Sequence, residues 1–371
     1  MNAEDMLTLK IRLLTEGVTL PEGEWAGRRG GAGPVGSRYF VLPNGRACGV
    51  PVRTGKMIRR YGPVALVPTG KKGLWLYDGK VRLKEVPKPG FYSLTTAEGT
   101  PYQKIALLHG ADVLATTVYQ SCRYWASGEQ CKFCTIPVSQ SVGDTILEKT
   151  PSQVAEVVRA AEKEGVIRSV LLTTGTPDTP DMGCRRLTQT AREIRRFSRI
   201  PIGVQFEPPA DQARIYELVE AGVNAVGMHI ECADDEVRRV MCPGKYRQAT
   251  LDQYRDSWNR TLNLLGRGNA STFFLEGLGE DNDTTLRMVD DVSAMGVMPV
   301  VLPVRPALGS QLADFTPTYV GDLAGSVEFY KEVGKILHKY QLNPAETAAG
   351  CHRCGACTPI QEAYDWARTN S

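Results

Sequence analysis

The chain has 371 residues, with 44 basic and 41 acidic side chains and a net charge of +3. This length allows two or three average domains, or one barrel of about 200 residues with extensions. The balanced charge produces no field that would favour nucleic acid as a partner. Met1 to Gly17 lacks a continuous apolar core, and no later apolar run approaches the length of a membrane span. We therefore expect a cytoplasmic protein that has no membrane segment.

Residues 1–110 differ in composition from the rest and predict a small β-rich N-terminal domain. Short β-branched and aromatic segments alternate here with turns rich in glycine and proline, and the expected strands cover residues 38–42, 47–52, 73–79 and 81–86. Residues 27–36 read GRRGGAGPVG and contain Arg28 and Arg29. This stretch would let a backbone approach an anionic ligand, or it is an ordinary mobile loop.

Three thiols follow the next expected strand, at residues 113–119. Cys122, Cys131 and Cys134 have the spacing C-x8-C-x2-C, with Phe133 before the last of them. Three thiolates fill three corners of a 4Fe-4S cluster and leave one iron free for an outside ligand. A zinc site and three ordinary buried thiols are the alternatives. Zinc normally needs a fourth ligand, and His109 lies upstream of the strand.

From Ala111 onward, strands alternate with helices, which is typical of a parallel α/β sheet or barrel. The helices show apolar residues at three- and four-residue spacing. Six strand–helix pairs are expected, with strands at 113–119, 169–175, 202–207, 225–231, 271–278 and 297–305.

The half motif C-x-aromatic-C and the six strand–helix pairs resemble the radical S-adenosylmethionine (SAM) superfamily, whose usual spacing is C-x3-C-x2-C. Within it, the chain is similar to biotin and lipoyl synthase-like members. It especially resembles the two-component lipoyl synthases and the radical SAM proteins encoded beside nitrilases. Their GRxGGAGP and CPGK-like stretches recur at residues 27–34 and 242–245. The resemblance implies a partial (β/α)6 barrel over residues 111–341, followed by a cysteine-rich segment at 342–371.

In a parallel barrel the reactive groups lie at the carboxyl ends of the strands. At the second and third strand ends, the resemblance implies that a turn binds the amino group of SAM and that two residues sharing a strand face bind ribose hydroxyls. A simple strand-to-helix turn is the alternative. These expected cofactor-binding residues are Thr174, Gly175, Thr176, Gln205 and Glu207.

At the last three strand ends, the resemblance implies further contacts to SAM or substrate. His229 and Glu231 share a face, although a lone histidine would more often be a core residue. Arg239 is a candidate for the methionine carboxylate. Gly277 and Gly279 resemble the adenine-binding turn, with packing as the competing reason for glycine. Arg305 is either a substrate or cofactor anchor or part of a rim salt bridge.

A second triad, Cys351, Cys354 and Cys357, has the spacing C-x2-C-x2-C, which is typical of an iron-sulfur ligand run. We expect a second, auxiliary iron-sulfur cluster here, and a zinc knuckle is the alternative. A cytosolic chain argues against disulfides. The fourth ligand would be an arginine, an outside molecule, or one of Cys48, Cys184, Cys232, Cys242 and His352.

The resemblance implies an enzyme that reductively cleaves SAM to a 5'-deoxyadenosyl radical, which abstracts hydrogen from an unactivated carbon. The expected outcome is sulfur insertion of the lipoyl synthase kind, using the auxiliary cluster. The alternative is rearrangement, cleavage or dehydrogenation of a small metabolite, with that cluster binding substrate or accepting an electron. Expected partners are SAM, a reductant such as ferredoxin or flavodoxin, and a small-molecule or carrier-bound substrate. A second radical SAM protein remains an open alternative. A hypothesis from another class is an electron-transfer protein with two ordinary clusters.

Overall fold

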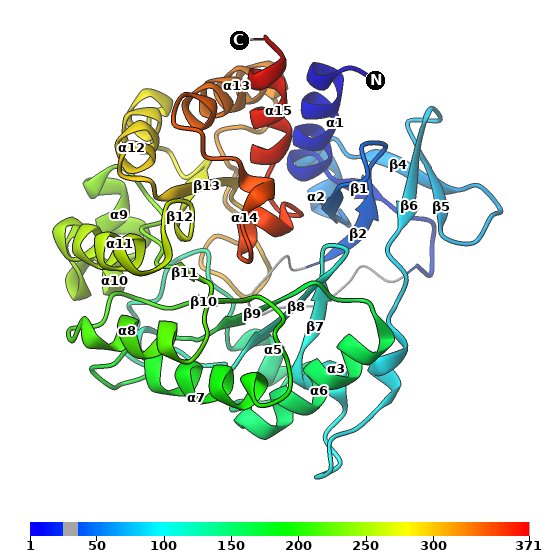
Figure 1. Cartoon of the computed structure of the whole chain (residues 1–371). Coiled ribbons are helices and arrows are strands. Elements are labelled where there is room, and N and C mark those ends of the chain that lie inside the picture. The colour runs from blue at the N-terminus through cyan, green and yellow to red at the C-terminus, as the bar shows by residue number, and fades with distance from the viewer. Residues whose placement is uncertain (25–35, 371) are drawn as a thin grey trace.

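A computed structural model of the chain describes residues 1–24 and 36–370. Residues 27–35 of the predicted glycine-rich loop, with Arg28 and Arg29, lie outside the described residues, as does the GRxGGAGP stretch. The described residues form a six-stranded and a seven-stranded sheet (Figure 1).

The larger sheet holds the six predicted strands in parallel, each beside its neighbour in sequence, so the six strand–helix pairs are confirmed. An additional strand, β7, pairs antiparallel with β8 and begins at Leu107, before the predicted boundary at residue 110. The strands of this sheet are β7 (Leu107–His109), β8 (Val113–Thr117), β9 (Ser169–Thr173), β10 (Ile202–Gln205), β11 (Ala225–Gly227), β12 (Ala270–Glu276) and β13 (Met298–Pro303).

Amphipathic helices connect these strands and pack their apolar sides against the sheet in one large core. Their ends follow the expected capping chemistry: Thr150 and Thr250 form capping boxes, and Gly165 and Gly296 end helices at positive φ. The helices that follow the six parallel strands are α6 (Pro151–Glu164), α7 (Cys184–Arg195), α8 (Ala213–Glu220), α11 (Leu251–Leu265), α12 (Asn282–Met295) and, after the last strand, α13 (Leu323–Lys339).

The large sheet curls into a partial barrel. Its two edge strands, β7 and β13, do not pair with each other, so the barrel is open along one side. Figure 1 shows the strands curving around the cysteine-rich segment near α14 (Cys351–Cys354). The predicted α/β class, a partial (β/α)6 barrel, is thus confirmed. All six parallel strands direct their carboxyl ends to one side of the sheet.

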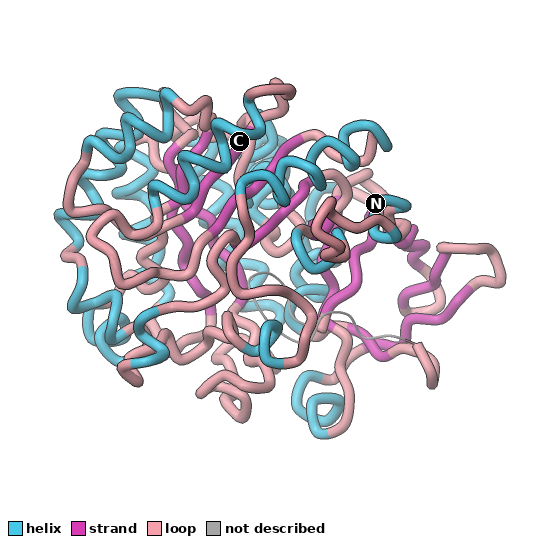
Figure 2. Tube along the Cα trace, turned by 90° about the horizontal axis from the view of Figure 1, so that it is seen from below, coloured by secondary structure: helices cyan, strands magenta, loops and turns pink. Residues whose placement is uncertain are grey.

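The smaller sheet lies at the open side of the barrel, where Figure 2 shows it projecting from the helix-covered body. Its order is β1-β4-β5-β6-β2-β3, and α1 (Ala3–Thr15) packs against it around a separate apolar core. Strands were expected in the regions of β2, β3, β5 and β6, whereas α1, β1 and β4 were not. The strands are β1 (Val18–Thr19), β2 (Ser37–Val41), β3 (Ala47–Pro51), β4 (Val64–Pro68), β5 (Leu74–Tyr77) and β6 (Val81–Glu85).

Short helices complete the described chain. No helix within residues 1–24 and 36–370 has the length and apolar character needed to cross a membrane. These remaining helices are α2 (Lys56–Tyr61), η1 (Gly90–Ser93), α3 (Tyr102–Ile105), α4 (Arg123–Ala126), α5 (Val138–Ser141), α9 (Asp235–Met241), α10 (Pro243–Gln248), η2 (Pro344–Glu346), α14 and α15 (Ile360–Asn370).

Candidate active site

The first cysteine triad lies in the loop that follows β8. Cys122 precedes α4, a single helical turn that occupies the start of the gap before Cys131. The chain then turns back through a hydrogen bond from Glu129 N to Tyr124 O of 2.7 Å. Cys131 and Cys134 are joined by a turn whose backbone N–H···O distance is 2.9 Å. The inserted helical turn is therefore the structural reason for the eight-residue gap.

The three thiols of this triad influence one another electrostatically. Burial raises the pKa of Cys122, and it raises the pKa of Cys134 to about 12. A hydrogen bond to Cys242, followed by burial, raises the pKa of Cys131 well above its ordinary value. Charge on Cys131 would raise the pKa of both other thiols. The thiols are therefore neutral when no cation is bound, and a bound cluster would have to displace their protons.

The turn after β9 is fastened directly to the first triad. Arg123 N donates to Thr176 O at 2.8 Å, and Gly175 N donates to Tyr119 O at 2.9 Å. A β-carbon at Gly175 would clash with the carbonyl oxygen of Ser121, the residue before Cys122. Close backbone approach at this turn thus requires glycine.

Two of the predicted cofactor-binding residues contact each other at the carboxyl ends of β9 and β10. Glu207 accepts hydrogen bonds from the Thr176 hydroxyl and, at 2.9 Å, from the Tyr124 hydroxyl. The carboxylate is buried, and these two donors compensate for the loss of water. Tyr124 was not predicted as a site residue.

Lys245 is a site residue that the sequence reasoning missed. Its ammonium donates to Glu231 at 2.7 Å and to the carbonyl of His229 at 3.3 Å. Burial alone would lower the pKa of Lys245, yet Glu231 and then Cys131 raise it well above its ordinary value. The CPGK stretch at 242–245 was the signal that could have identified this lysine.

His229 stacks on Phe273, with ring centroids 3.5 Å apart and nearly parallel planes. His229 as a whole is 8% exposed, and neither ring nitrogen has a hydrogen-bond partner among the described residues. Burial, with smaller contributions from Lys245 and His352, lowers the pKa of His229 well below its ordinary value. The imidazole is therefore neutral.

A central cavity of about 400 Å³ lies inside the partial barrel, between the two triads. Its walls combine aliphatic and aromatic side chains with a few polar groups. It is lined by Cys134 of the first triad and by all three thiols of the second. The predicted cofactor-binding residues that line it are Thr174, Thr176, Gln205, Glu207, His229, Glu231 and Arg305. Cys122 instead faces an outer hollow of about 690 Å³.

Besides Gly175, three predicted cofactor-binding residues do not line the central cavity. Arg239 is exposed on α9 and forms hydrogen bonds of 3.0 and 2.7 Å with Glu236 of the same helix. A β-carbon at Gly277 would meet the ring of Tyr319 at 2.7 Å, so packing requires that glycine. Gly279 has a φ of 102° and no neighbour within 4 Å of the position a β-carbon would take.

Arg305 lines the cavity, and within the described residues it does not form the rim salt bridge that was the alternative to an anchoring role. Its guanidinium donates to Ser37 Oγ at 3.2 Å and to Gly49 O at 2.9 Å, both in the smaller sheet. Among the described residues it has no carboxylate within ion-pair distance. Its charge also lowers the pKa of Cys357, against the larger effect of burial.

The second triad fills the interior of the barrel. Gln205 Nε2 donates to Cys351 Sγ at 3.2 Å, which places Cys351 at the carboxyl end of β10. Arg353 donates twice to Asp112 at 2.8 Å, before the start of β8. The Thr358 hydroxyl donates to Val301 O in β13. The segment thus bridges the open edges of the sheet.

The thiols of this triad are buried together. Burial is the largest cause that raises the pKa of Cys351, Cys354 and Cys357, with Cys354 at about 12. Charge on Cys357 would raise the pKa of the other two. As in the first triad, cations are needed before three thiolates can share one site.

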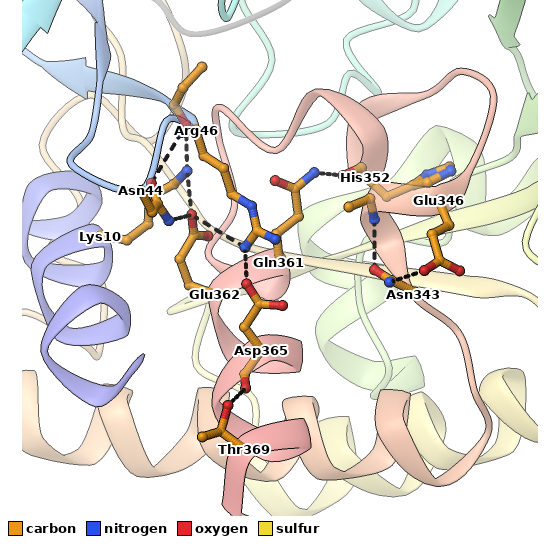
Figure 3. A network of polar contacts seen from close by, with 12 residues as sticks. Lys10, Asn44, Arg46, Asn343, Glu346, His352, Gln361, Glu362, Asp365 and Thr369 are labelled. Atoms are coloured by element: carbon orange, nitrogen blue, oxygen red, sulfur yellow. Dashed lines mark hydrogen bonds and ion pairs between the residues drawn. The ribbon is translucent and has the colours of Figure 1, made fainter. Parts of the chain in front are cut away.

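A polar network holds the C-terminal segment against the smaller sheet (Figure 3). Lys10 of α1 and Glu362 of α15 form a buried ion pair of 3.5 Å. Asn44 Nδ2 donates to the same carboxylate at 3.2 Å, and Arg46 pairs with Asp365 at 2.8 Å. Gln361, the neighbour of Glu362, donates to the carbonyl of His352 at 2.7 Å. The network therefore ties the second triad to both ends of the chain.

The candidates for a fourth ligand of the second triad lie in different places. Cys184 begins α7 in the main core, whereas Cys232 and Cys242 pack with Cys131 of the first triad. Cys48 lies in β3, close enough for charge on Cys357 to raise its pKa. His352 is fully buried, and neither ring nitrogen has a partner among the described residues.

Within residues 1–24 and 36–370, no three His, Cys, Asp or Glu side chains are gathered tightly enough to hold one metal ion. All ten cysteines are free thiols. A cluster binds each thiolate through a different iron, so its ligands do not have to converge on a single point.

Comparison with known proteins gives one family match: residues 128–266 match the radical SAM superfamily. The match includes Cys131, Cys134 and the 242–245 stretch, and it begins after Cys122. A bacteriochlorophyllide c C-7(1)-hydroxylase of Chlorobaculum limnaeum is 22% identical over 279 residues, which cover 70% of this chain and 68% of that protein. A lipoyl synthase of Parabacteroides distasonis is 31% identical over 169 residues, 45% of this chain. The chain covers 56% of the length of that lipoyl synthase.

Among solved structures, a methylornithine synthase aligns with a TM-score of 0.47 at 17% sequence identity. The alignment covers 67% of this chain and 71% of the synthase chain. A radical SAM methyltransferase from Sphaerobacter thermophilus aligns with a TM-score of 0.46 at 14% identity, over 76% of this chain and 77% of its own.

Proposed function

The chain belongs to the radical SAM superfamily, and on that premise we propose that it is an enzyme for sulfur insertion into an unactivated C–H bond. The family implies a 4Fe-4S cluster, SAM as cosubstrate and a reductant. The finer assignment, a lipoyl synthase-like reaction that uses an auxiliary cluster, is our proposal.

One observation carries the proposal: Cys134 of the first triad lines the same central cavity as Cys351, Cys354 and Cys357. A substrate bound there would lie between the two triads. Positioning of this kind is the main contribution a protein makes to cofactor chemistry.

In this proposal Cys122, Cys131 and Cys134 hold the first cluster, and the turn Thr174–Thr176 lies beside it to bind SAM. The bound groups would supply the radical that abstracts hydrogen. Glu207, held by Tyr124 and Thr176, offers its carboxylate as an acceptor for hydroxyl groups. The apolar walls exclude water from the reacting carbon.

Further predicted contacts are His229, Glu231 and Arg305, which line the cavity. The neutral imidazole of His229 offers a hydrogen bond to a ligand because neither nitrogen is used within the described residues. Glu231 is neutralised by Lys245. Arg239, Gly277 and Gly279 remain weaker candidates because they do not line the cavity.

The second triad would hold the auxiliary cluster that donates sulfur. The lipoyl synthase relative, at 31% identity, supports this outcome. The buried thiols of the second triad, which need cations to share their site, also suit an iron-sulfur cluster.

A second candidate function is hydrogen abstraction without sulfur transfer, leading to rearrangement, cleavage or dehydrogenation of a small metabolite. The auxiliary cluster would then bind substrate or accept an electron. The relative named as a hydroxylase, which matches 70% of this chain, favours this candidate. The reductant in either case would be a ferredoxin or flavodoxin, and we propose a cytoplasmic location.

The test is anaerobic reconstitution followed by incubation with SAM and dithionite. We expect 5'-deoxyadenosine from the wild type and from Cys184→Ala, whose thiol lies in the main core at the start of α7, and none from Cys134→Ala. No 5'-deoxyadenosine from the wild type would refute the enzyme proposal. A product with new C–S bonds and a consumed auxiliary cluster would support sulfur insertion, whereas turnover with that cluster intact would support the second candidate.

A further inference from the structure

The segment Cys242–Lys245 is joined to the loop of the first triad by backbone hydrogen bonds. Lys132 N donates to Met241 O at 2.8 Å, and Gly244 N donates to Glu129 O at 3.0 Å. These two bonds lie on either side of Cys131 and Cys242 along the chain. The pairing therefore brings the two cysteines next to each other, although 111 positions separate them in the sequence.

The close approach of the two segments depends on Gly244. A β-carbon there would clash with the ring of Tyr124 and would stand 2.8 Å from Glu129 O. On the far side, Lys245 is anchored by its 2.7 Å bond to Glu231. Cys242 N donates to Arg238 O at 2.8 Å at the end of α9. The backbone of Cys242 is thus fixed from several directions.

The side chains complete a row of three thiols. Cys242 and Cys232 are both fully buried, and both pack with Cys131 in a small apolar cluster that includes Leu275 and Leu278. The Cys242 thiol therefore lies against Cys131 and Cys232 within this cluster. Neither Cys232 nor Cys242 lines the central cavity.

We propose that Cys242 is a positioning residue for the first cluster, and that its thiol donates a hydrogen bond to the sulfur of Cys131. An iron-bound thiolate has no proton and can only accept, so the shared proton must belong to Cys242. With the Cys242 proton directed at Cys131, the thiol of Cys232, which packs in the same cluster, is the group left to donate to the Cys242 sulfur. Hydrogen bonds to cluster sulfurs stabilise the more negative, reduced state and raise the reduction potential. The inference rests on the proposed function, because it requires a cluster on the first triad.

The experiment compares the reduction potential of the first cluster in the wild type, Cys242→Ala, Cys242→Ser and Cys232→Ala. The electron paramagnetic resonance signal of the first cluster is identified as the signal that Cys134→Ala lacks. We expect Cys242→Ala to shift the potential downward, because it removes the donor. Cys242→Ser keeps a shorter O–H donor and should shift less, and Cys232→Ala should cause a small shift in the same direction. Cys184→Ala removes another fully buried thiol and should leave the potential unchanged.

An unchanged potential in Cys242→Ala with full iron content would overturn the inference and leave the proposed function intact. An equal shift in Cys184→Ala would also overturn it, because any buried thiol would then have the same effect. If Cys242→Ala fails to take up iron, the comparison of Cys242→Ser with Cys232→Ala decides: unchanged potentials in both refute the inference. A wild type without a first-cluster signal would refute the proposed function, and the inference with it.

Discussion

Gln205 Nε2 donates a hydrogen bond of 3.2 Å to Cys351 Sγ, so the last residue of β10 contacts the second triad. The same side chain lines the central cavity, which Cys134 of the first triad also lines. Gln205 therefore links the second triad to the wall of the cavity. Because its amide already donates to a sulfur atom, the nearby Glu207 is better placed to accept hydrogen bonds from the hydroxyl groups of a cofactor.

Replacing Gln205 with Leu should lower the reduction potential of the second cluster without changing the affinity for SAM. The lost hydrogen bond would disfavour the reduced state by on the order of 1 kcal/mol, or roughly 40 mV for one electron. Potentiometric titration and equilibrium binding of SAM check the two parts. As a matched comparison, Gln205→Glu should lower the potential further because it adds a negative charge. A loss of SAM affinity with an unchanged potential would instead support the ribose-binding assignment of Gln205.

The iron bound by the protein should divide equally between the two triads. Anaerobically reconstituted wild type should hold about eight irons per chain, and Cys354→Ala about four, given two 4Fe-4S clusters. Iron and sulfide analysis checks this, and Cys184→Ala should match the wild type because its thiol lies at the start of α7. Four irons in both the wild type and Cys354→Ala would mean that the second triad holds no cluster.

The buried pair Lys245–Glu231 should show strong energetic coupling. Removing one partner leaves a buried charge unpaired, so Lys245→Met alone should lower the free energy of unfolding by on the order of 3–5 kcal/mol. Adding Glu231→Gln should recover much of that loss, since neither charge then remains. Thermal unfolding of both single variants and the double variant measures the coupling, and strictly additive losses would contradict it.

The regular part of the fold was predictable because short-range sequence patterns determine it. The six parallel strands and their helices follow from apolar periodicity and from caps such as Thr150 and Gly165, which act within a few residues. Helices α1 and α15 were not expected, because their burial depends on each other and on the smaller sheet, as the pair Lys10–Glu362 shows. Such long-range packing leaves no signal within a short window of sequence.

The site was predictable to the extent that strand ends define it. Glu207 and His229 line the cavity because they follow β10 and β11 directly. Arg239 does not line the cavity, and periodicity does not fix which way an exposed side chain on a short helix points. Lys245 was missed because it meets its partner, Glu231, only after the chain has passed through α9 and turned back in α10. Ligand binding by these residues stays a prediction.

Glu276, at the end of β12, should make the stability of the protein fall as the pH rises. Burial raises the pKa of Glu276 from 4.5 to about 7, while the hydrogen bond from Ser326 Oγ, 2.8 Å long, opposes this. Between these two values the folded state retains a proton that the unfolded state has released. Stability is therefore greatest below pH 4.5, declines up to about pH 7, and is level above it as far as this group is concerned.

The variant Glu276→Gln removes the titrating proton and keeps the size of the side chain. At pH 8 it should be more stable than the wild type by on the order of 2–3 kcal/mol, and near pH 5 the two proteins should differ little. Unfolding followed by calorimetry at both pH values measures the difference. Glu22→Gln, at an exposed position, is the control and should follow the wild type at each pH. A constant difference between Glu276→Gln and the wild type across the range would show that Glu276 does not titrate in this window.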